Sequence, residues 1–153
     1  MINEMRLCFL SRGENESLAR LSVAGFLAPL DPTMDVLDDM KTAVSEAVTN
    51  AIIHGYEGNA DEMVYVSAFL YRLEEEGFLL RVDVEDTGVG MEDVKKAMEP
   101  LYTTAPGGER AGMGFAFMEA FTDSLKVESG PGKGTCVSMW KRLPGPEACE
   151  HEQ

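Results

Sequence analysis

The chain has 153 residues, and its 13 basic against 27 acidic residues give a formal net charge of −14 at pH 7. This length fits one domain that can bury a core without disulfide staples, while the negative charge disfavours direct binding to nucleic acid or to an anionic membrane. No apolar run reaches the roughly 18 residues that a membrane span needs, and the N-terminus lacks the basic and long apolar regions of a signal peptide.

The first part of the chain predicts one strand and two helices. Residues 5–11 alternate between apolar and polar and predict a strand. Residues 15–30 are rich in Ala and Leu and predict a helix. The Asp-Pro-Thr sequence at residues 31–33 offers an N-cap and an N1 proline for a second helix. That helix runs to about residue 54, and Gly55 is a natural C-terminal stop.

The second part of the chain predicts four strands and two shorter helices. In chain order they are strands at 63–73 and 78–86, a short helix at 92–98, a loop at 100–111, a helix at 112–121, and strands at 125–129 and 135–142. This order indicates an α+β fold, a two-layer α/β sandwich with helices on one face of a mixed, mostly antiparallel sheet. We expect a domain over residues 1–143 and a solvated acidic tail over residues 144–153.

The cysteines and histidines do not indicate a zinc site. Cys8, Cys136 and Cys149 are widely spaced, no Cys-x-x-Cys occurs, and the chain has two histidines. We therefore expect reduced thiols and a cytoplasmic location.

The first motif lies on the second predicted helix. Glu46 and Asn50 are four residues apart and share one helical face, which His54 extends. The Asn50 carboxamide suits a hard cation such as Mg²⁺, and Glu46 is placed to accept a proton or orient a water. The alternative interpretation is a solvent-facing polar stripe.

The second motif follows the strand at residues 78–86. Period-2 alternation puts Asp86 on the apolar face of that strand, where a carboxylate needs a hydrogen-bonding partner such as the exocyclic amine of adenine. Gly88 and Gly90 come directly afterwards and allow a flat ligand to approach the backbone. The alternative interpretation is a capped turn at the end of a strand.

The third motif is the glycine-rich sequence at residues 107–115, which predicts a flexible loop that runs into a helix. Its backbone N–H groups and the helix dipole suit phosphates, and Arg110 adds one movable cation. A hinge without a ligand is the alternative.

Taken together, the three motifs resemble the N box and the two glycine boxes of the GHKL ATPase/kinase superfamily. Longer strings, among them residues 14–17, 30–35, 44–56 and 110–115, resemble the anti-sigma F factor family of serine-protein kinases. The resemblance runs from about Asn3 to Lys141.

The resemblance implies a site for ATP or ADP with Mg²⁺. Glu46 would be the catalytic base, Asn50 the Mg²⁺ ligand and Asp86 the acceptor for the adenine amine. The further nucleotide-binding residues it implies are Gly88, Gly90, Met91, Thr104, Arg110, Gly112, Met113, Gly114, Phe115 and Thr135.

The resemblance also implies two protein partners. One is a sigma factor, bound in a nucleotide-dependent way through Arg20 with Glu16 one turn earlier. The other is an anti-anti-sigma protein, phosphorylated on a serine by this ATP-dependent protein serine kinase. A homodimer is expected. For Glu16 and Arg20 the alternative is a simple ion pair on the helix surface. For the whole protein the alternatives are a stress-response or switch-type kinase with other partners, and a nucleotide-gated sigma-binding module with little kinase activity.

Overall fold

The computed structural model describes residues 1–99 and 114–145, and within them every predicted strand lies within two residues of its expected ends. In chain order the elements are β1 (Asn3–Leu10), α1 (Asn15–Leu27), a 3-10 turn (Ala28–Leu30), α2 (Met34–Asn50), a π-helical turn (Ala51–Gly55), β2 (Met63–Arg72), β3 (Phe78–Asp86), α3 (Val94–Ala97), α4 (Gly114–Phe121), β4 (Ser124–Ser129) and β5 (Thr135–Leu143).

The five strands form one sheet in the order β1-β2-β3-β5-β4, and all four pairs of neighbours are antiparallel. The α+β class is therefore confirmed, whereas the expectation of a mixed sheet is wrong. Since β3 and β4 are both antiparallel to β5, they run in the same direction. They do not form a parallel pair because β5 lies between them.

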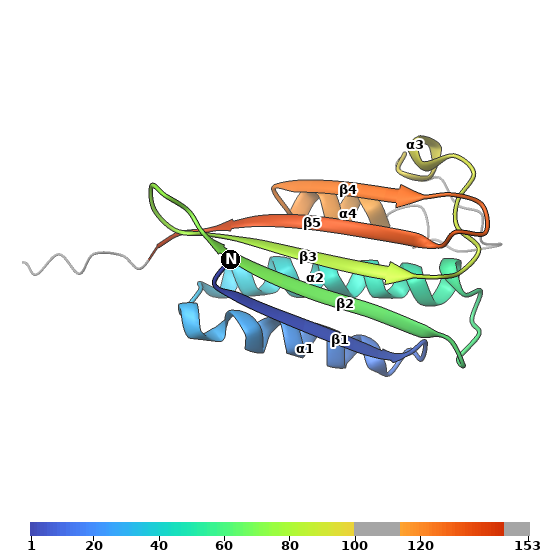
Figure 1. Cartoon of the computed structure of the whole chain (residues 1–153), viewed down its shortest axis with the longest axis horizontal. Helices are drawn as coiled ribbons and strands as arrows, with labels where there is room; N and C mark the ends of the chain where they lie inside the picture. Colours follow the sequence, from blue (N-terminus) through green and yellow to red (C-terminus); the bar gives the residue numbers. More distant parts are fainter. Residues whose placement is uncertain (100–113, 146–153) are drawn as a thin grey trace, which may run out of the picture.

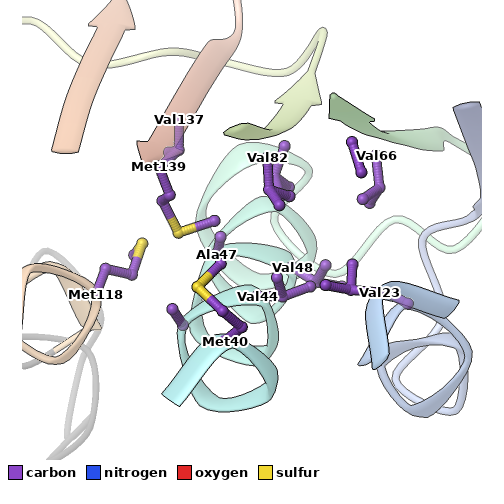
Figure 2. Close-up of a cluster of buried hydrophobic side chains, with 14 of the residues drawn as sticks. Val23, Met40, Val44, Ala47, Val48, Val66, Val82, Met118, Val137 and Met139 are labelled. Carbon is purple, nitrogen blue, oxygen red and sulfur yellow. The ribbon is translucent and has the colours of Figure 1, made fainter. Parts of the chain in front are cut away.

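The helices α1, α2 and α4 pack on one face of the sheet (Figure 1), as the two-layer prediction requires. Alternation along β3 buries every second residue, including Val82, against these helices. In Figure 2, Val66 and Val82 of the sheet face Val44 and Val48 of α2. Full burial of one such side chain contributes roughly 1.5–3 kcal/mol, so this layer contact holds α2 firmly against β3.

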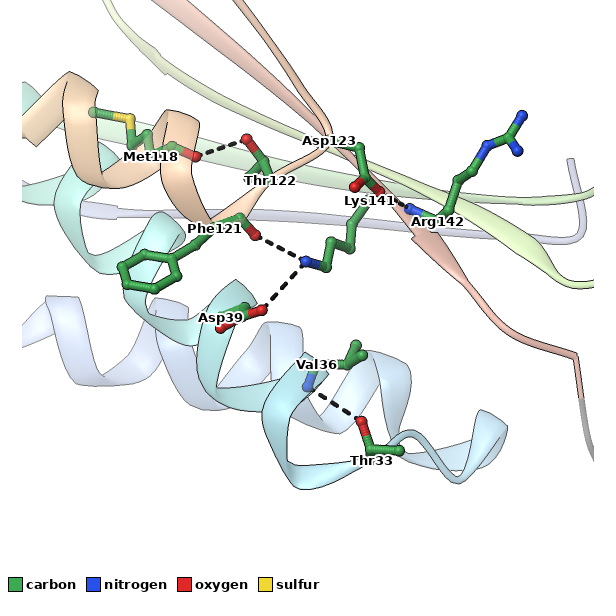
Figure 3. Close-up of polar contacts among 9 residues, drawn as sticks. All are labelled: Thr33, Val36, Asp39, Met118, Phe121, Thr122, Asp123, Lys141 and Arg142. Carbon is green, nitrogen blue, oxygen red and sulfur yellow. Dashed lines mark hydrogen bonds and ion pairs between the residues drawn. The ribbon is translucent and has the colours of Figure 1, made fainter.

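The start of α2 differs from the prediction in its capping residue. The N-cap is Thr33, whose hydroxyl accepts a hydrogen bond from the Val36 N–H at 3.3 Å (Figure 3). Asp31 instead ends the 3-10 turn in the left-handed region, at φ 49°, so Pro32 precedes the helix and is not its first residue. The threonine hydroxyl satisfies an N–H that has no partner within the helix.

A partly buried lysine ties α4 to α2 and to the sheet. The Lys141 ammonium on β5 donates to the Asp39 carboxylate at 3.3 Å and to the Phe121 carbonyl at 3.1 Å (Figure 3). A cation at the last carbonyls of α4 is favourable because that end of a helix carries partial negative charge. This contact fixes the C-terminal end of α4, so the opposite end faces the end of α2.

Three further observations concern the part of the chain that the structure describes. None of its helices combines the length and the apolar character needed to cross a membrane. Cys8 and Cys136 are free thiols, and Cys149 lies outside the described residues. No group of three or more His, Cys, Asp or Glu side chains that could hold a metal occurs over residues 1–99 and 114–145.

Candidate functional site

The first motif lies on the last turns of α2. Glu46 is only 8% exposed and Asn50 is half-buried, so the solvent-facing stripe, the alternative interpretation, is wrong for Glu46. Burial of a carboxylate is costly, which makes this position unlike an ordinary surface glutamate. His54, one turn further, is half-buried, and burial lowers the pKa of its imidazole, which favours the neutral form.

The Asn50 carboxamide lies against the first residue of α4. A β-carbon on Gly114 would stand 3.0 Å from both Nδ2 and Oδ1 of Asn50, and that is closer than nearly all real contacts of a β-carbon. Gly114 therefore permits the amide to reach the N-terminal end of α4. Backbone N–H groups at such an end favour anions, so a neutral oxygen ligand and an anion-favouring helix end lie side by side.

The second motif is buried at the end of β3. Asp86 is 4% exposed, on the apolar face as predicted, and its Oδ1 accepts a hydrogen bond from the Gly88 N–H at 3.0 Å. Burial raises the pKa of the Asp86 carboxyl, and backbone hydrogen bonds from Gly88 and Thr135 oppose that rise. In its ionised form the Asp86 carboxylate offers more acceptor sites than these two backbone donors use.

Gly55 lies directly over the Asp86 carboxylate. A β-carbon on Gly55 would stand 2.6 Å from Cγ and Oδ2 and 2.7 Å from Oδ1 of Asp86. The helical segment does end at Gly55, as predicted, but this glycine does not have a positive φ. Its role is to admit the carboxylate, which the interpretation as a C-terminal stop missed. Glu57 and Gly58 supply the left-handed residues that follow.

The glycines of the first glycine box and of the β4–β5 turn bring three backbone segments together. A β-carbon on Gly88 would stand 1.8 Å from the Gly55 carbonyl oxygen, and one on Gly90 would stand 1.9 Å from the Gly130 carbonyl oxygen. A β-carbon on Gly134 would stand 2.0 Å from the backbone oxygen of Asp86. The motif is therefore more than a capped turn, since it joins the end of α2 to the β4–β5 turn.

Thr135 and Met91 are connected through a residue that the sequence analysis missed. The Ser129 hydroxyl lies 2.9 Å from the Thr135 hydroxyl and accepts from the Met91 N–H at 2.8 Å. It donates to the Gly134 carbonyl at 2.8 Å. Ser129 thereby holds two predicted nucleotide-binding residues in place. Its position at the end of a predicted strand gave no signal beyond ordinary strand alternation.

Tyr56 is a second residue that the sequence analysis missed. It is 7% exposed, and its hydroxyl accepts from the Thr87 N–H at 2.8 Å and donates to the Met63 carbonyl. The ring therefore anchors the residue that follows Asp86 to the start of β2. Its place directly after Gly55 was a possible signal, because a buried tyrosine hydroxyl normally has partners.

A cavity of about 330 Å³ lies at the same end of the sheet. Asp86 and Thr135 contribute to its wall, together with Glu85, Glu128 and Cys136 from the opposite face of the strands. Because the Asp86 carboxylate itself lies against Gly55 on the helix side, we do not assign this cavity to the adenine ring.

The two predicted partner-binding residues on α1 have different surroundings. The Glu16 carboxylate accepts hydrogen bonds from the hydroxyls of Ser45 and Thr49 on α2. The Arg20 guanidinium donates to the Ser17 hydroxyl at 3.3 Å. No ion pair joins Glu16 to Arg20 in the described chain, so the surface-pair alternative is wrong.

Part of the predicted site falls in a segment that the structure does not describe. Thr104, Arg110, Gly112 and Met113 lie outside the described residues, and so do residues 146–153 of the predicted tail. Phe115 is half-buried and packs against the core. The structure thus places Gly114 against Asn50, one turn after Glu46 on α2, and places Asp86 against Gly55 at the end of the π-helical turn that follows α2.

Comparison with known proteins gives a consistent result. Residues 9–141 match the family of histidine kinase-like ATPase domains. The chain is 54% identical to the anti-sigma F factor of Clostridium acetobutylicum over 141 residues, which is 92% of this chain and 94% of that protein. It is 50% identical to the anti-sigma F factor of Bacillus velezensis over 143 residues, 94% of each.

Among solved structures, the RsbU and RsbW domains of a Mycobacterium tuberculosis protein share this fold with a TM-score of 0.65. The match covers 94% of this chain and 33% of that chain, at 20% identity. At this identity the likeness concerns the fold alone, and it agrees with the α+β arrangement described above.

Proposed function

Because the chain belongs to the histidine kinase-like ATPase family and, within it, to the anti-sigma F factors, we propose that it uses ATP to phosphorylate a serine of an anti-anti-sigma protein. We also propose that it binds and inhibits a sporulation sigma factor in a nucleotide-dependent way. The observation that carries this proposal is that α2 holds the buried Glu46 and the half-buried Asn50, and that the π-helical turn directly after it ends at Gly55 over Asp86.

The Asp86 pocket fits an adenine ring. An unprotonated carboxylate accepts hydrogen bonds and cannot donate them, which suits the exocyclic amine of adenine. Gly55 and Gly88 let the backbone at residue 55 pack directly on Asp86 and on residue 88, so the carboxylate would be held from within the chain when it accepts the amine. Gly90, Met91 and Thr135 would line the same side, held by Ser129.

The other end of the site fits the phosphates and their cation. When bound, ATP would supply the γ-phosphoryl group, and Mg²⁺ would neutralise the charge of the phosphates. The Asn50 oxygen would be the Mg²⁺ ligand from this chain, as hard cations prefer oxygen donors. Gly55 lies five positions after Asn50, at the end of the π-helical turn Ala51–Gly55. Thr104, Arg110, Gly112 and Met113 remain predicted contacts of the phosphates.

Glu46 would act as the general base. Its buried carboxylate lies one helical turn from Asn50 and would receive the proton of the attacking serine hydroxyl. The reaction therefore needs α2 to present Glu46 and Asn50 together. The rate of transfer would then depend on how α2 is held in place.

The proposed partners are proteins. Arg20 on α1 would contact the sigma factor, and Glu16 stays a predicted contact beside it. A net charge of −14 suits basic protein partners and disfavours nucleic acid. We further propose that the protein is a homodimer and acts in the cytoplasm. Sedimentation of the purified chain tests the oligomeric state, and a monomer at micromolar concentration would contradict the dimer.

A transfer assay beside a sigma-factor capture assay tests the function. The chain is incubated with labelled ATP and the anti-anti-sigma protein, and in parallel with the sigma factor in ATP or ADP. We expect phosphoserine on the first partner and tighter capture of the second in ATP. Nucleotide-dependent capture without phosphoserine would leave a binding module, and transfer to other partners only would identify a different kinase of the same family.

A further inference from the structure

One carboxylate on α1 reaches across to the helix that carries the proposed catalytic pair. Glu16 occupies the second position of α1, and its two oxygens accept hydrogen bonds from two different residues of α2. Ser45 donates to Oε1, and Thr49 donates to Oε2 at 3.2 Å. All three side chains are partly buried, so water competes for these hydrogen bonds less than at an exposed site.

The two hydroxyls are spaced in the same way as the proposed catalytic pair. Ser45 immediately precedes Glu46, and Thr49 immediately precedes Asn50. Both pairs have i, i+4 spacing, so each pair lies along its own side of α2, about 100° apart. A carboxylate that spans one helical turn resists both sliding of α2 along its axis and rotation about it. Either motion would carry Glu46 and Asn50 away from their places.

The chemistry of the contact also constrains its geometry. An ionised carboxylate can only accept, so each hydroxyl must donate toward Glu16, and hydrogen bonds to a charged acceptor are stronger than neutral ones. The nearby Glu14 makes no side-chain capping hydrogen bond. Among the acidic residues at the start of α1, Glu16 is therefore the one whose carboxylate bridges the two helices.

We propose that Glu16 is a positioning residue, which sets the placement of Glu46 and Asn50 from within the chain. Its loss would impair phosphoryl transfer and the Mg²⁺-dependent part of ATP binding. Adenine recognition at Asp86 would be spared, since that pocket is held by Gly55, Gly88 and Tyr56. The inference rests on the proposed function for its transfer readout, and on the Asn50 assignment for its binding readout.

The experiment compares Glu16→Ala with Glu16→Gln and with the double variant Ser45→Ala/Thr49→Ala. Glu14→Ala is the matched control. Two quantities are measured for each protein: the kcat and KM of transfer to the anti-anti-sigma protein, and the ATP affinity with and without Mg²⁺. The far-UV circular dichroism and Tm of each variant confirm that it is folded.

We expect Glu16→Ala to lower kcat about tenfold and to reduce the Mg²⁺-dependent gain in ATP affinity, with Mg²⁺-free affinity unchanged. Glu16→Gln should restore both, because its amide can accept from one hydroxyl and donate to the other. The double variant should reproduce the loss, and adding Glu16→Ala to it should cost nothing more.

Three results would overturn the inference. If the double variant transfers at the wild-type rate while Glu16→Ala is slow, Glu16 acts by touching the partner. If Glu16→Ala matches Glu14→Ala in both measurements, it positions nothing. If wild-type protein transfers no phosphate, the proposed kinase function fails, and the positioning role is then judged from the Mg²⁺-dependent gain in ATP affinity alone. The same gain in Glu16→Ala as in wild type would reject that role.

Discussion

Gly55 and Asp86 are in contact at the centre of the candidate nucleotide site, with the carboxylate where a side chain on residue 55 would stand. A β-carbon there would lie 2.6 Å from Cγ of Asp86, whereas real β-carbons essentially never approach closer than 3.0 Å. The end of the π-helical turn that follows α2 and the end of β3 thus pack directly together because residue 55 has no side chain. This relationship leads to the first prediction.

Gly55→Ala should displace the Asp86 carboxylate and lower ATP affinity at least tenfold, because one of the two residues must move. Overpacking of this kind also costs about 1–3 kcal/mol of stability. Isothermal titration calorimetry with ATP measures the loss of affinity. Gly25→Ala on the exposed side of α1 meets nothing within 4 Å and should leave affinity unchanged. Equal affinities in both variants would show that Asp86 tolerates the displacement.

Asp86→Asn should lower ATP affinity by about 10- to 100-fold. Loss of a hydrogen bond to a charged group costs roughly 1.5–3 kcal/mol, and each 1.4 kcal/mol is tenfold in affinity. The control is Glu85→Gln, which removes a charge from the opposite, exposed face of the same strand. Unchanged ATP binding by Asp86→Asn would remove Asp86 from the adenine pocket.

The stability of wild type relative to Asp86→Asn should depend on pH in the nucleotide-free protein. Burial raises the pKa of Asp86 in the folded state, so the protonated acid favours folding. Its contribution is fully present below the unfolded-state pKa of about 3.9 and is lost as pH rises through the raised folded-state pKa. Urea unfolding from pH 4 to pH 7 should therefore show wild type losing stability relative to Asp86→Asn as the pH rises. A constant difference between the two proteins would contradict this.

Glu46→Gln should abolish serine phosphorylation and spare ATP binding. General base catalysis contributes about 10²- to 10⁴-fold, so the transfer rate should fall by at least 100-fold while ATP affinity stays within about threefold. Asp38→Asn, an exposed acid at the start of the same helix, is the control for charge removal. Phosphoserine formation at the wild-type rate in Glu46→Gln would reject its assignment as the base.

Arg20→Glu should weaken sigma-factor binding at least tenfold and leave phosphoryl transfer within about threefold. Reversal of a charge at an interface places like charges together and removes a donor. Arg12→Glu, which reverses an exposed charge just before α1, gives the same change in net charge outside the predicted surface. Capture of the sigma factor is measured for both variants, and equal capture would move the partner surface away from Arg20.

Much of the site was predictable because it follows from local patterns. Period-2 alternation along residues 78–86 was enough to put Asp86 on the buried face, and i, i+4 spacing was enough to pair Glu46 with Asn50. The same local rules correctly located the strands and the helix that ends at Gly55. They did less well for the cap of α2, since Asp31 and Thr33 are both good capping residues and the backbone conformation chose between them.

The sequence by itself therefore determined the elements, their faces and the family to which the chain belongs. The tertiary structure decided that the sheet is antiparallel throughout and that Gly55 packs on the Asp86 carboxylate. It also decided that Glu16 accepts a hydrogen bond from Ser45, 29 residues away. The reason is physical. Periodicity records how a side chain relates to its neighbours along the chain. These three features instead depend on segments that are distant in the sequence and meet only in the folded chain.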